Sequence, residues 1–267
     1  VNDKLSLSVQ KDMLPLVGNV DDIYSVLSDN EVIDGDLFVV PSTSAFVSGA
    51  HGEYLCSPRI DNLTSVYASL KALIGSDGEG IRIACCFDNE EIGSLTKQGA
   101  NSALLENTLR FIMRSIGGTE EDFAAAVSDG YILSVDNAHA VHPAHPEKSD
   151  PVEKVVMNGG IVIKHHTNYS TDALSSAILK TILDKAGVKY QDYYNNSDIR
   201  CGGTIGLVTS ARLNMKACDI GLAQLAMHSG IETIGLSDIP VMESCIKAFF
   251  STTLSVDGAN TEISVKN

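Results

Sequence analysis

Apolar side chains follow two alternating patterns along this chain: short continuous runs, and longer stretches in which they recur every three or four residues. The continuous runs at 81–87, 131–136 and 160–166 predict strands covered on both faces. The segment ACDIGLA (217–223) leads into Met227 and His228. The recurring pattern predicts helices over 62–74, 100–116, 119–128, 172–187 and 241–254. Strands that alternate with amphipathic helices indicate an α/β fold, with a mostly parallel central sheet flanked by helices.

The first part of the chain is more polar. A short helix is expected within VDDIYSVLSD, and the turn-prone DGD that follows suggests a boundary near residue 35. DLFVVP (36–41) predicts a strand, GEYLCSPRI (52–60) an extended segment and VKYQDYY (188–194) an edge strand. We therefore divide the chain into residues 1–35 and 36–267.

Acidic side chains stand where several of these predicted elements begin or end. Asp61 precedes the helix at 62–74, Glu90 and Glu91 follow the run at 81–87, and Asp136 closes the run at 131–136. Function in open α/β sheets gathers beyond the carboxyl ends of the strands, and carboxylates together with an imidazole such as that of His228 can bind Zn²⁺, Mn²⁺ or Co²⁺. From spacing alone, Asp61 could equally be a helix cap and His228 a core histidine.

Composition narrows the possible functions. The 267 residues carry a formal net charge of −15, which argues against binding to a nucleic-acid backbone. The six cysteines form no CxxC pair and several lie in apolar runs, so they are expected to be buried free thiols of a reducing cytoplasm. No apolar run reaches the roughly 20 residues of a membrane span, and no signal-peptide pattern opens the chain.

Six motifs then point to one family. In chain order they are SPRIDNLTSVYASLKAL, CCFDNEEIGSLTKQGA, SVDNAHAVHPAHPEKSDP, NGGIVIK, GGTIGLVTSARLNMKACDIGLAQLAMHS and IKAFF. Their order and spacing resemble those of the M18 zinc aminopeptidases, the aspartyl aminopeptidase and aminopeptidase I group, from about residue 1 to the end. The resemblance implies the zinc-peptidase (phosphorylase/hydrolase-like) fold. NEEIGS and the MHS segment favour M18 over the related M42 and M28 groups.

The resemblance also implies roles for the acidic groups. Asp61 would bridge two metal ions, Glu91 and His228 would bind one of them, and Asp136 would bind the other. Glu90 would be the general base that activates the bridging water. Successive side chains of an extended pair point in opposite directions, so Glu90 and Glu91 can share these tasks only if the backbone bends at the strand end.

The implied reaction is removal of N-terminal amino acids from peptides by a metalloaminopeptidase. Two divalent ions are expected as cofactors, zinc by default, with cobalt or manganese as alternatives. Lys164, Gly203 and Thr204 match positions that line the substrate pocket, and a Lys there could pair with an acidic P1 side chain. Acidic and neutral P1 preferences both stay open. The implied partners are peptides and further copies of the chain in a homo-oligomer, a dodecamer in the family, without nucleic acid or membrane.

The sequence departs from the family near its beginning. Family members carry a further His ligand in a His-x-Asp-Ser motif, which is absent here, and residues 1–35 resemble the tail of the family's dimerisation domain. The expectation is a catalytic portion that lacks its N-terminal part and has low activity by itself. The alternative function is an inactive peptidase-like fragment that serves as a structural or binding module. The histidines of DNAHAVHPAHPE lie beside prolines, so we expect an extended segment rather than a separate metal site.

Overall fold

The computed structural model describes residues 6–257 and 260–265, and the chain divides into two compact units, Val1–Ser42 and Thr43–Asn267. In the first unit, two single-turn helices, α1 (Val9–Asp12) and α2 (Tyr24–Leu27), are joined by exposed chain. α2 confirms the short helix expected there. The strand expected at 36–41 is wrong: these residues are exposed and pair with no other strand among the described residues.

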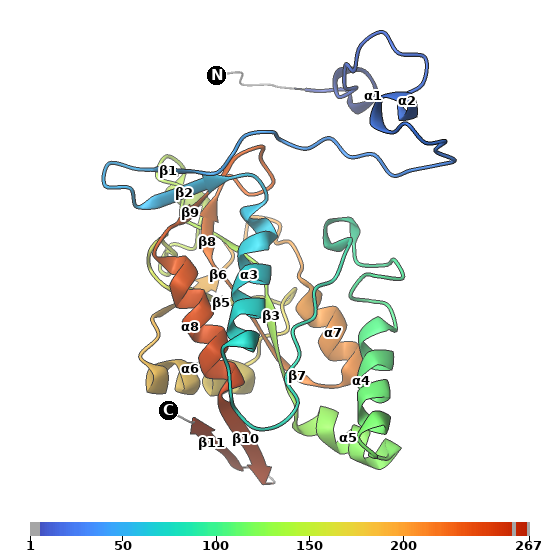
Figure 1. Ribbon diagram of the computed structural model, residues 1–267. Coiled ribbons are helices and arrows are strands. Elements are labelled where there is room, and N and C mark those ends of the chain that lie inside the picture. Colours follow the sequence, from blue (N-terminus) through green and yellow to red (C-terminus); the bar gives the residue numbers. More distant parts are fainter. Residues whose placement is uncertain (1–5, 258–259, 266–267) are drawn as a thin grey trace. The chain divides into compact units, whose positions relative to one another are not determined.

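A four-stranded sheet lies at the centre of the second unit (Figure 1). Its order is β3 (Tyr131–Val135), β7 (Lys216–Gly221), β5 (Ile161–His165) and β6 (Tyr190–Tyr194). β3 runs parallel to β7 and β5 parallel to β6, whereas β5 and β7 are antiparallel. The α/β class is confirmed, and β6 is the edge strand that the sequence predicts.

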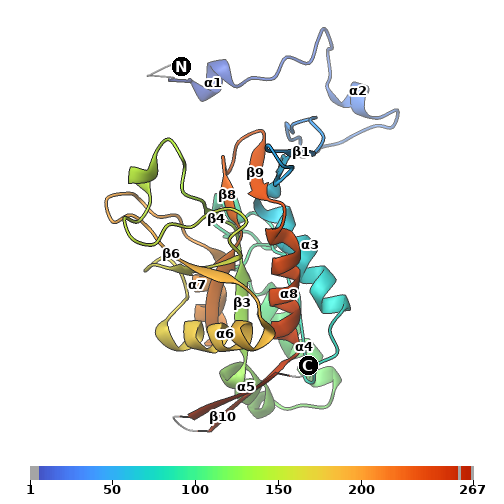
Figure 2. The ribbon, with the colours of Figure 1, turned by 90° about the vertical axis from the view of Figure 1, so that its left-hand side faces the viewer.

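Two long helices pack together against this sheet. α3 (Ile60–Ile74) and α8 (Asp238–Phe250) run side by side in both ribbon views (Figures 1 and 2), and α6 (Ala173–Ala186) contacts α8. Buried side chains of these helices, including Ala68, Leu179 and Met242, join Ile163 and Ile220 of the sheet in one apolar core. α6 begins with a capping box at Asp172 and ends at Gly187, whose φ of 65° suits a residue without Cβ.

A second sheet continues the strands of the first. Its order is β1 (Phe46–Ser48), β2 (Tyr54–Ser57), β9 (Glu232–Gly235), β8 (Ala223–Leu225) and β4 (Ala138–His139). The chain passes from β3 to β4 through Asp136 and Asn137, and from β7 to β8 through Leu222. The junction of the two sheets therefore places Asp136 between them.

The remaining elements surround this framework. The predicted helices over 100–116 and 119–128 appear as α4 (Leu104–Ser115) and α5 (Glu120–Asp129), while α7 (Ile205–Leu213) lies against β3 and β7. Two short 3-10 turns, η1 (Glu90–Ile92) and η2 (Pro146–Lys148), interrupt long loops. A hairpin that the sequence did not predict, β10 (Thr252–Asp257) and β11 (Asn260–Val265), follows α8. Among the described residues, no helix has the length and apolar character needed to cross a membrane.

The segment 81–87 is the main correction. The continuous apolar run predicts a central strand, but the segment is a chain without regular structure, and Ile81, Cys85 and Cys86 are exposed. An apolar run becomes a strand only where a neighbouring strand offers hydrogen bonds, and none of the described strands pairs with it. All six thiols are free, as expected, but only Cys56, Cys201, Cys218 and Cys245 are buried.

Candidate metal centre

Asp61 lies at the start of α3, where the helical geometry is not yet established. Its φ of −79° and ψ of 109° are extended, and its side chain is 6% exposed. The backbone N–H of Asp61 donates to Oε2 of Glu232 over 2.9 Å. The structure thus confirms that Asp61 stands where a loop meets a helix, with its carboxylate turned into the protein.

Two further groups meet the Asp61 carboxylate. Nε2 of His228 lies 3.2 Å from Oδ2 of Asp61 and 3.0 Å from Oε1 of Glu91. One ligand atom from each of these three residues lies within 4.8 Å of the other two. The side chains of His228 and Glu91 are 58% and 60% exposed, so an ion from solution can reach the cluster.

A turn carries Glu90 and Glu91. Asn89 has a φ of 59° and Gly93 a φ of 99°, both left-handed, and the η1 turn lies between them. The backbone therefore bends at these residues, as the sequence requires if neighbouring glutamates are to serve one site. Glu90 and Glu91 both line the cavity described below.

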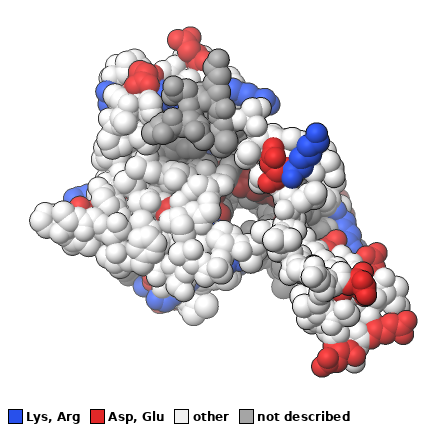
Figure 3. Space-filling model, turned by 90° about the horizontal axis from the view of Figure 1, so that it is seen from above, with Lys and Arg blue, Asp and Glu red and all other residues white. Residues whose placement is uncertain are grey.

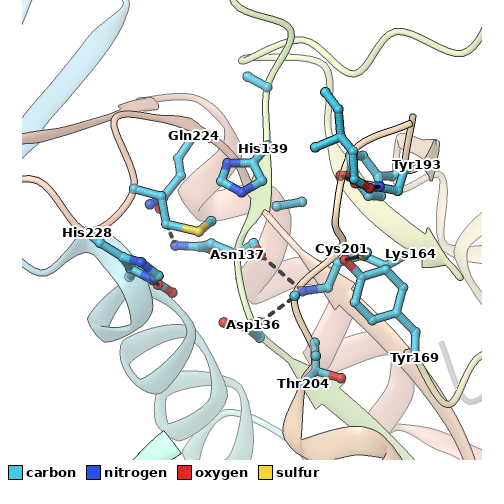
Figure 4. A pocket seen from close by; sticks show the side chains of 18 of the residues that line it. Asp136, Asn137, His139, Lys164, Tyr169, Tyr193, Cys201, Thr204, Gln224 and His228 are labelled. Atoms are coloured by element: carbon cyan, nitrogen blue, oxygen red, sulfur yellow. Dashed lines mark hydrogen bonds and ion pairs between the residues drawn. The ribbon is translucent and has the colours of Figure 1, made fainter. Parts of the chain in front are cut away.

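Asp136 lies beside this cluster and faces a buried cation. Its Oδ2 lies 3.0 Å from Nζ of Lys164, whose side chain is only 2% exposed. Lys164 also donates to the carbonyl oxygen of Asn137 over 3.0 Å and lies over the ring of Tyr169 at 5.1 Å (Figure 4). Two of the predicted site residues, Asp136 and Lys164, are thus partners of one another.

An unsatisfied oxygen marks the centre of the site. Oδ1 of Asp61 is buried and has no hydrogen-bond partner among the described residues. Burial, then the charges of Asp136 and Glu91, raise the pKa of Asp61 to about 7. A buried carboxylate among like charges needs a cation or a proton, so the residues present fit a divalent metal ion.

Glu90 is perturbed in the same direction. Burial, followed by the charges of Asp136 and Glu91, raises the pKa of Glu90 to about 7, although Lys164 and His228 act against this rise. A carboxyl whose pKa lies near neutrality can both accept and release a proton at physiological pH. This is the property expected of a general acid and base.

The cluster opens into a cavity of about 800 Å³, which Lys164, Gly203 and Thr204 also line. Thr204 is buried, and its hydroxyl donates to the carboxylate of Asp219 over 2.5 Å. Gly203 is exposed, and a Cβ added there would meet no atom within 4 Å. The structure therefore brings all eight predicted site residues to one cavity.

Three buried polar residues that support the site were missed in the sequence. Asn137 donates to Gln224 and to the carbonyl oxygen of Ile60, and so ties the β3–β4 junction to the start of α3 (Figure 4). Asp219 accepts hydrogen bonds from Ser134, Ser170 and Thr204. Glu232, the third, binds two backbone N–H groups at the cluster. The available signal was a carboxylate inside an apolar strand, in CDIG for Asp219 and IETIG for Glu232.

On the face drawn in Figure 3, the Lys and Arg side chains of the described residues are scattered, with Asp and Glu side chains between them.

Comparison with known proteins identifies the family. The family model described as aminopeptidase I zinc metalloprotease (M18) matches residues 3–250. The chain belongs to the M18 family. This result confirms the resemblance carried by the six motifs and favours M18 over M42 and M28.

Individual M18 proteins support the assignment. A probable M18 family aminopeptidase 2 of Clostridium novyi (strain NT) is 38% identical in an alignment that covers 94% of this chain and 62% of that protein. The crystal structure of an M18 aminopeptidase from Thermotoga maritima has the same fold, with a TM-score of 0.73 at 23% identity over 79% of this chain and 49% of that one. The S. cerevisiae mApe1 dodecamer gives a TM-score of 0.68 at 29% identity, over 78% of this chain and 48% of that one. The chain thus spans between about half and two thirds of the length of these relatives.

Proposed function

We propose that this chain is the metal-binding part of a metalloaminopeptidase that removes N-terminal residues from peptides. Membership of a zinc metalloprotease family supports the reaction class. The observation that carries the proposal is the convergence of Asp61, Glu91 and His228 within 4.8 Å, together with a buried Asp61 carboxylate oxygen that lacks a hydrogen-bond partner among the described residues.

In this proposal, Asp61 would hold both of two divalent ions. Glu91 and His228 would complete the binding of one ion, and Asp136 would contribute to the other. Carboxylate oxygens and an imidazole nitrogen are ligands that zinc prefers, and cobalt or manganese can also use them. Lys164 occupies one oxygen of Asp136, so the other oxygen is the one available to a metal.

A divalent metal in such a site polarises the scissile carbonyl group and lowers the pKa of water. Glu90 takes the proton from the attacking water and delivers it to the leaving amine. Its raised pKa, about 7, suits both transfers. The free α-amine of the peptide would bind at this acidic end of the cavity, which limits cleavage to the first residue.

The far wall of the cavity holds the P1 side chain. Thr204 and Gly203 line it, and the small Gly203 leaves room beside the substrate backbone. Lys164 is the cation that an acidic P1 side chain would meet, but it is already paired with Asp136. An acidic P1 group must therefore share this ammonium, whereas a neutral P1 group leaves the pair intact.

We also propose that the parent protein works as a homo-oligomer in the cytoplasm. The related S. cerevisiae mApe1 forms a dodecamer. Six cysteines without a disulfide fit a reducing compartment.

Metal content tests the site. We expect the purified chain, equilibrated with Zn²⁺ and passed through a desalting column, to retain zinc when measured by mass spectrometry. Asp61→Ala should lose it, whereas Glu243→Gln, which changes a carboxylate on α8 outside the cavity, should retain it. A folded wild-type chain that retains no zinc would instead support the alternative, a non-catalytic structural or binding module.

Hydrolysis of aminoacyl p-nitroanilides tests the reaction. The low turnover expected of the wild-type chain should be lost in Glu90→Gln, while the zinc content of that variant stays unchanged. Turnover retained in Glu90→Gln would show that Glu90 is not the general base.

A further inference from the structure

Glu232 is a buried carboxylate whose two oxygens hold two separate segments of the metal cluster. It lies on β9 and is 2% exposed. Its Oε2 accepts the backbone N–H of Asp61 over 2.9 Å, and its Oε1 accepts the backbone N–H of His228 over 2.7 Å. Both oxygens are therefore committed to the main chain of proposed metal ligands, and Glu232 faces no Lys or Arg partner among the described residues.

The segment that carries His228 needs such support. Ala226 has a φ of 58° and His228 a φ of 65°, both in the left-handed region that residues with a Cβ rarely adopt. Such a conformation is unfavourable for these residues and persists only where the surroundings fix it. Two hydrogen bonds hold this backbone: His228 N–H donates to Oε1 of Glu232, and Ser229 N–H donates to the carbonyl oxygen of Ala226.

The other segment arrives from a different part of the chain. β2 pairs antiparallel with β9, and Ser57 lies opposite Glu232 in this register. The chain then turns into α3, so Asp61 returns to the same carboxylate four residues later. Glu232 is thus the point at which the start of α3 and the loop after β8 are joined.

We propose that Glu232 is a positioning residue of the metal centre: its carboxylate fixes the separation of the Asp61 and His228 ligand atoms before a metal binds. This inference rests on the proposed metal site. The preset geometry lowers the ordering cost of binding, and the buried negative charge favours a cation nearby. Glu232 touches neither metal nor substrate in this role.

The sharpest test is Glu232→Gln, which keeps the shape of the side chain. Glutamine offers one acceptor oxygen and one donor NH₂ group, so one of the two backbone N–H groups must face a donor. Partners of this kind typically contribute 10- to 100-fold in metal affinity. We expect the Kd for Zn²⁺, measured by competition with a chromophoric chelator, to rise by about that factor, with the circular dichroism of the folded state preserved.

Asp238→Asn is the matched control. Asp238 is 1% exposed and also accepts two backbone N–H groups, from Asn158 over 2.5 Å and from Gly160 over 2.9 Å, but neither belongs to the metal cluster. It should lower stability as Glu232→Gln does while leaving the Kd for Zn²⁺ within about twofold of wild type. Equal Kd values for wild type, Glu232→Gln and Asp238→Asn would overturn the proposal.

A second variant covers the case in which Glu232→Gln does not fold. Glu232→Asp keeps the charge but shortens the side chain by one methylene, so a single carboxylate can no longer reach both segments. Weakened zinc binding in folded Glu232→Asp supports the proposal, and wild-type affinity contradicts it. Failure of the wild-type chain to bind zinc would instead refute the proposed function, so the two failures are distinguishable.

Discussion

The buried pair of Lys164 and Asp136 gives the most direct prediction for stability. Lys164→Met removes the ammonium group but keeps most of the aliphatic stem, so little packing is lost. Asp136 then lacks the cation 3.0 Å away and still lies next to Asp61 and Glu91. The change therefore leaves one carboxylate uncompensated in an acidic cluster.

The exposed fractions set the size of the effect. Removing one partner of a buried ion pair costs about 3–5 kcal/mol. Lys164 is 2% exposed, but Asp136 is 21% exposed and regains part of its hydration, so the lower end applies. We expect the free energy of unfolding to fall by about 3 kcal/mol, roughly a 150-fold change in the unfolding equilibrium.

Urea denaturation followed by circular dichroism, with chelator present, measures this loss. Lys180→Met is the matched control because Lys180 and Asp192 are 30% and 25% exposed, and pairs open to water are worth about 0–1 kcal/mol. The double variant Lys164→Met/Asp136→Asn should recover part of the loss because no unpaired charge remains. If Lys164→Met costs no more than Lys180→Met, the buried pair does not stabilise the site as argued.

Three further results are expected. Burial raises the pKa of Asp192, but hydrogen bonds from Lys180 and His165 lower this pKa by more, so the net shift is downward. The Asp192 carboxylate therefore stabilises the fold at pH values above the ordinary aspartate pKa, and this stabilisation is lost as the pH falls through the lowered pKa. Urea titrations should show the gap between wild type and Asp192→Asn closing in acid, and a gap independent of pH contradicts this. Gly206→Ala should lower the free energy of unfolding by about 1–3 kcal/mol, because the new Cβ would lie 2.5 Å from a carboxylate oxygen of Asp219. Gly202→Ala is the control, since a Cβ there would meet no atom within 4 Å. Equal melting temperatures of the two variants would refute the steric argument. A thiol reagent should modify two cysteines rapidly and four slowly in the native chain, and six equal rates contradict the burial pattern.

Periodicity located five of the helices and two of the buried strands. Helical spacing located α3, α4, α5, α6 and α8 to within a few residues, because the buried face of an amphipathic helix requires apolar residues every three or four positions. The buried runs at 131–136 and 160–166 became β3 and β5 for a similar reason. The candidate site residues Asp61, Glu90, Glu91, Asp136 and His228 were chosen from the sequence because the family motifs contain them. The strand expected before Glu90 and Glu91 does not form.

Tertiary structure decided what a single segment cannot encode. The run at 81–87 is as apolar as β5, yet it forms no strand, because a strand also requires a hydrogen-bonding neighbour that local sequence does not specify. Lys164 pairs with Asp136, which is 28 positions away in the sequence. Glu232 binds the backbone of Asp61, 171 positions away, and that of His228, 4 positions away. The sequence determined which side chains could bind a metal ion. Folding alone decided which of them meet and which buried carboxylates hold them, because those contacts depend on distances in space.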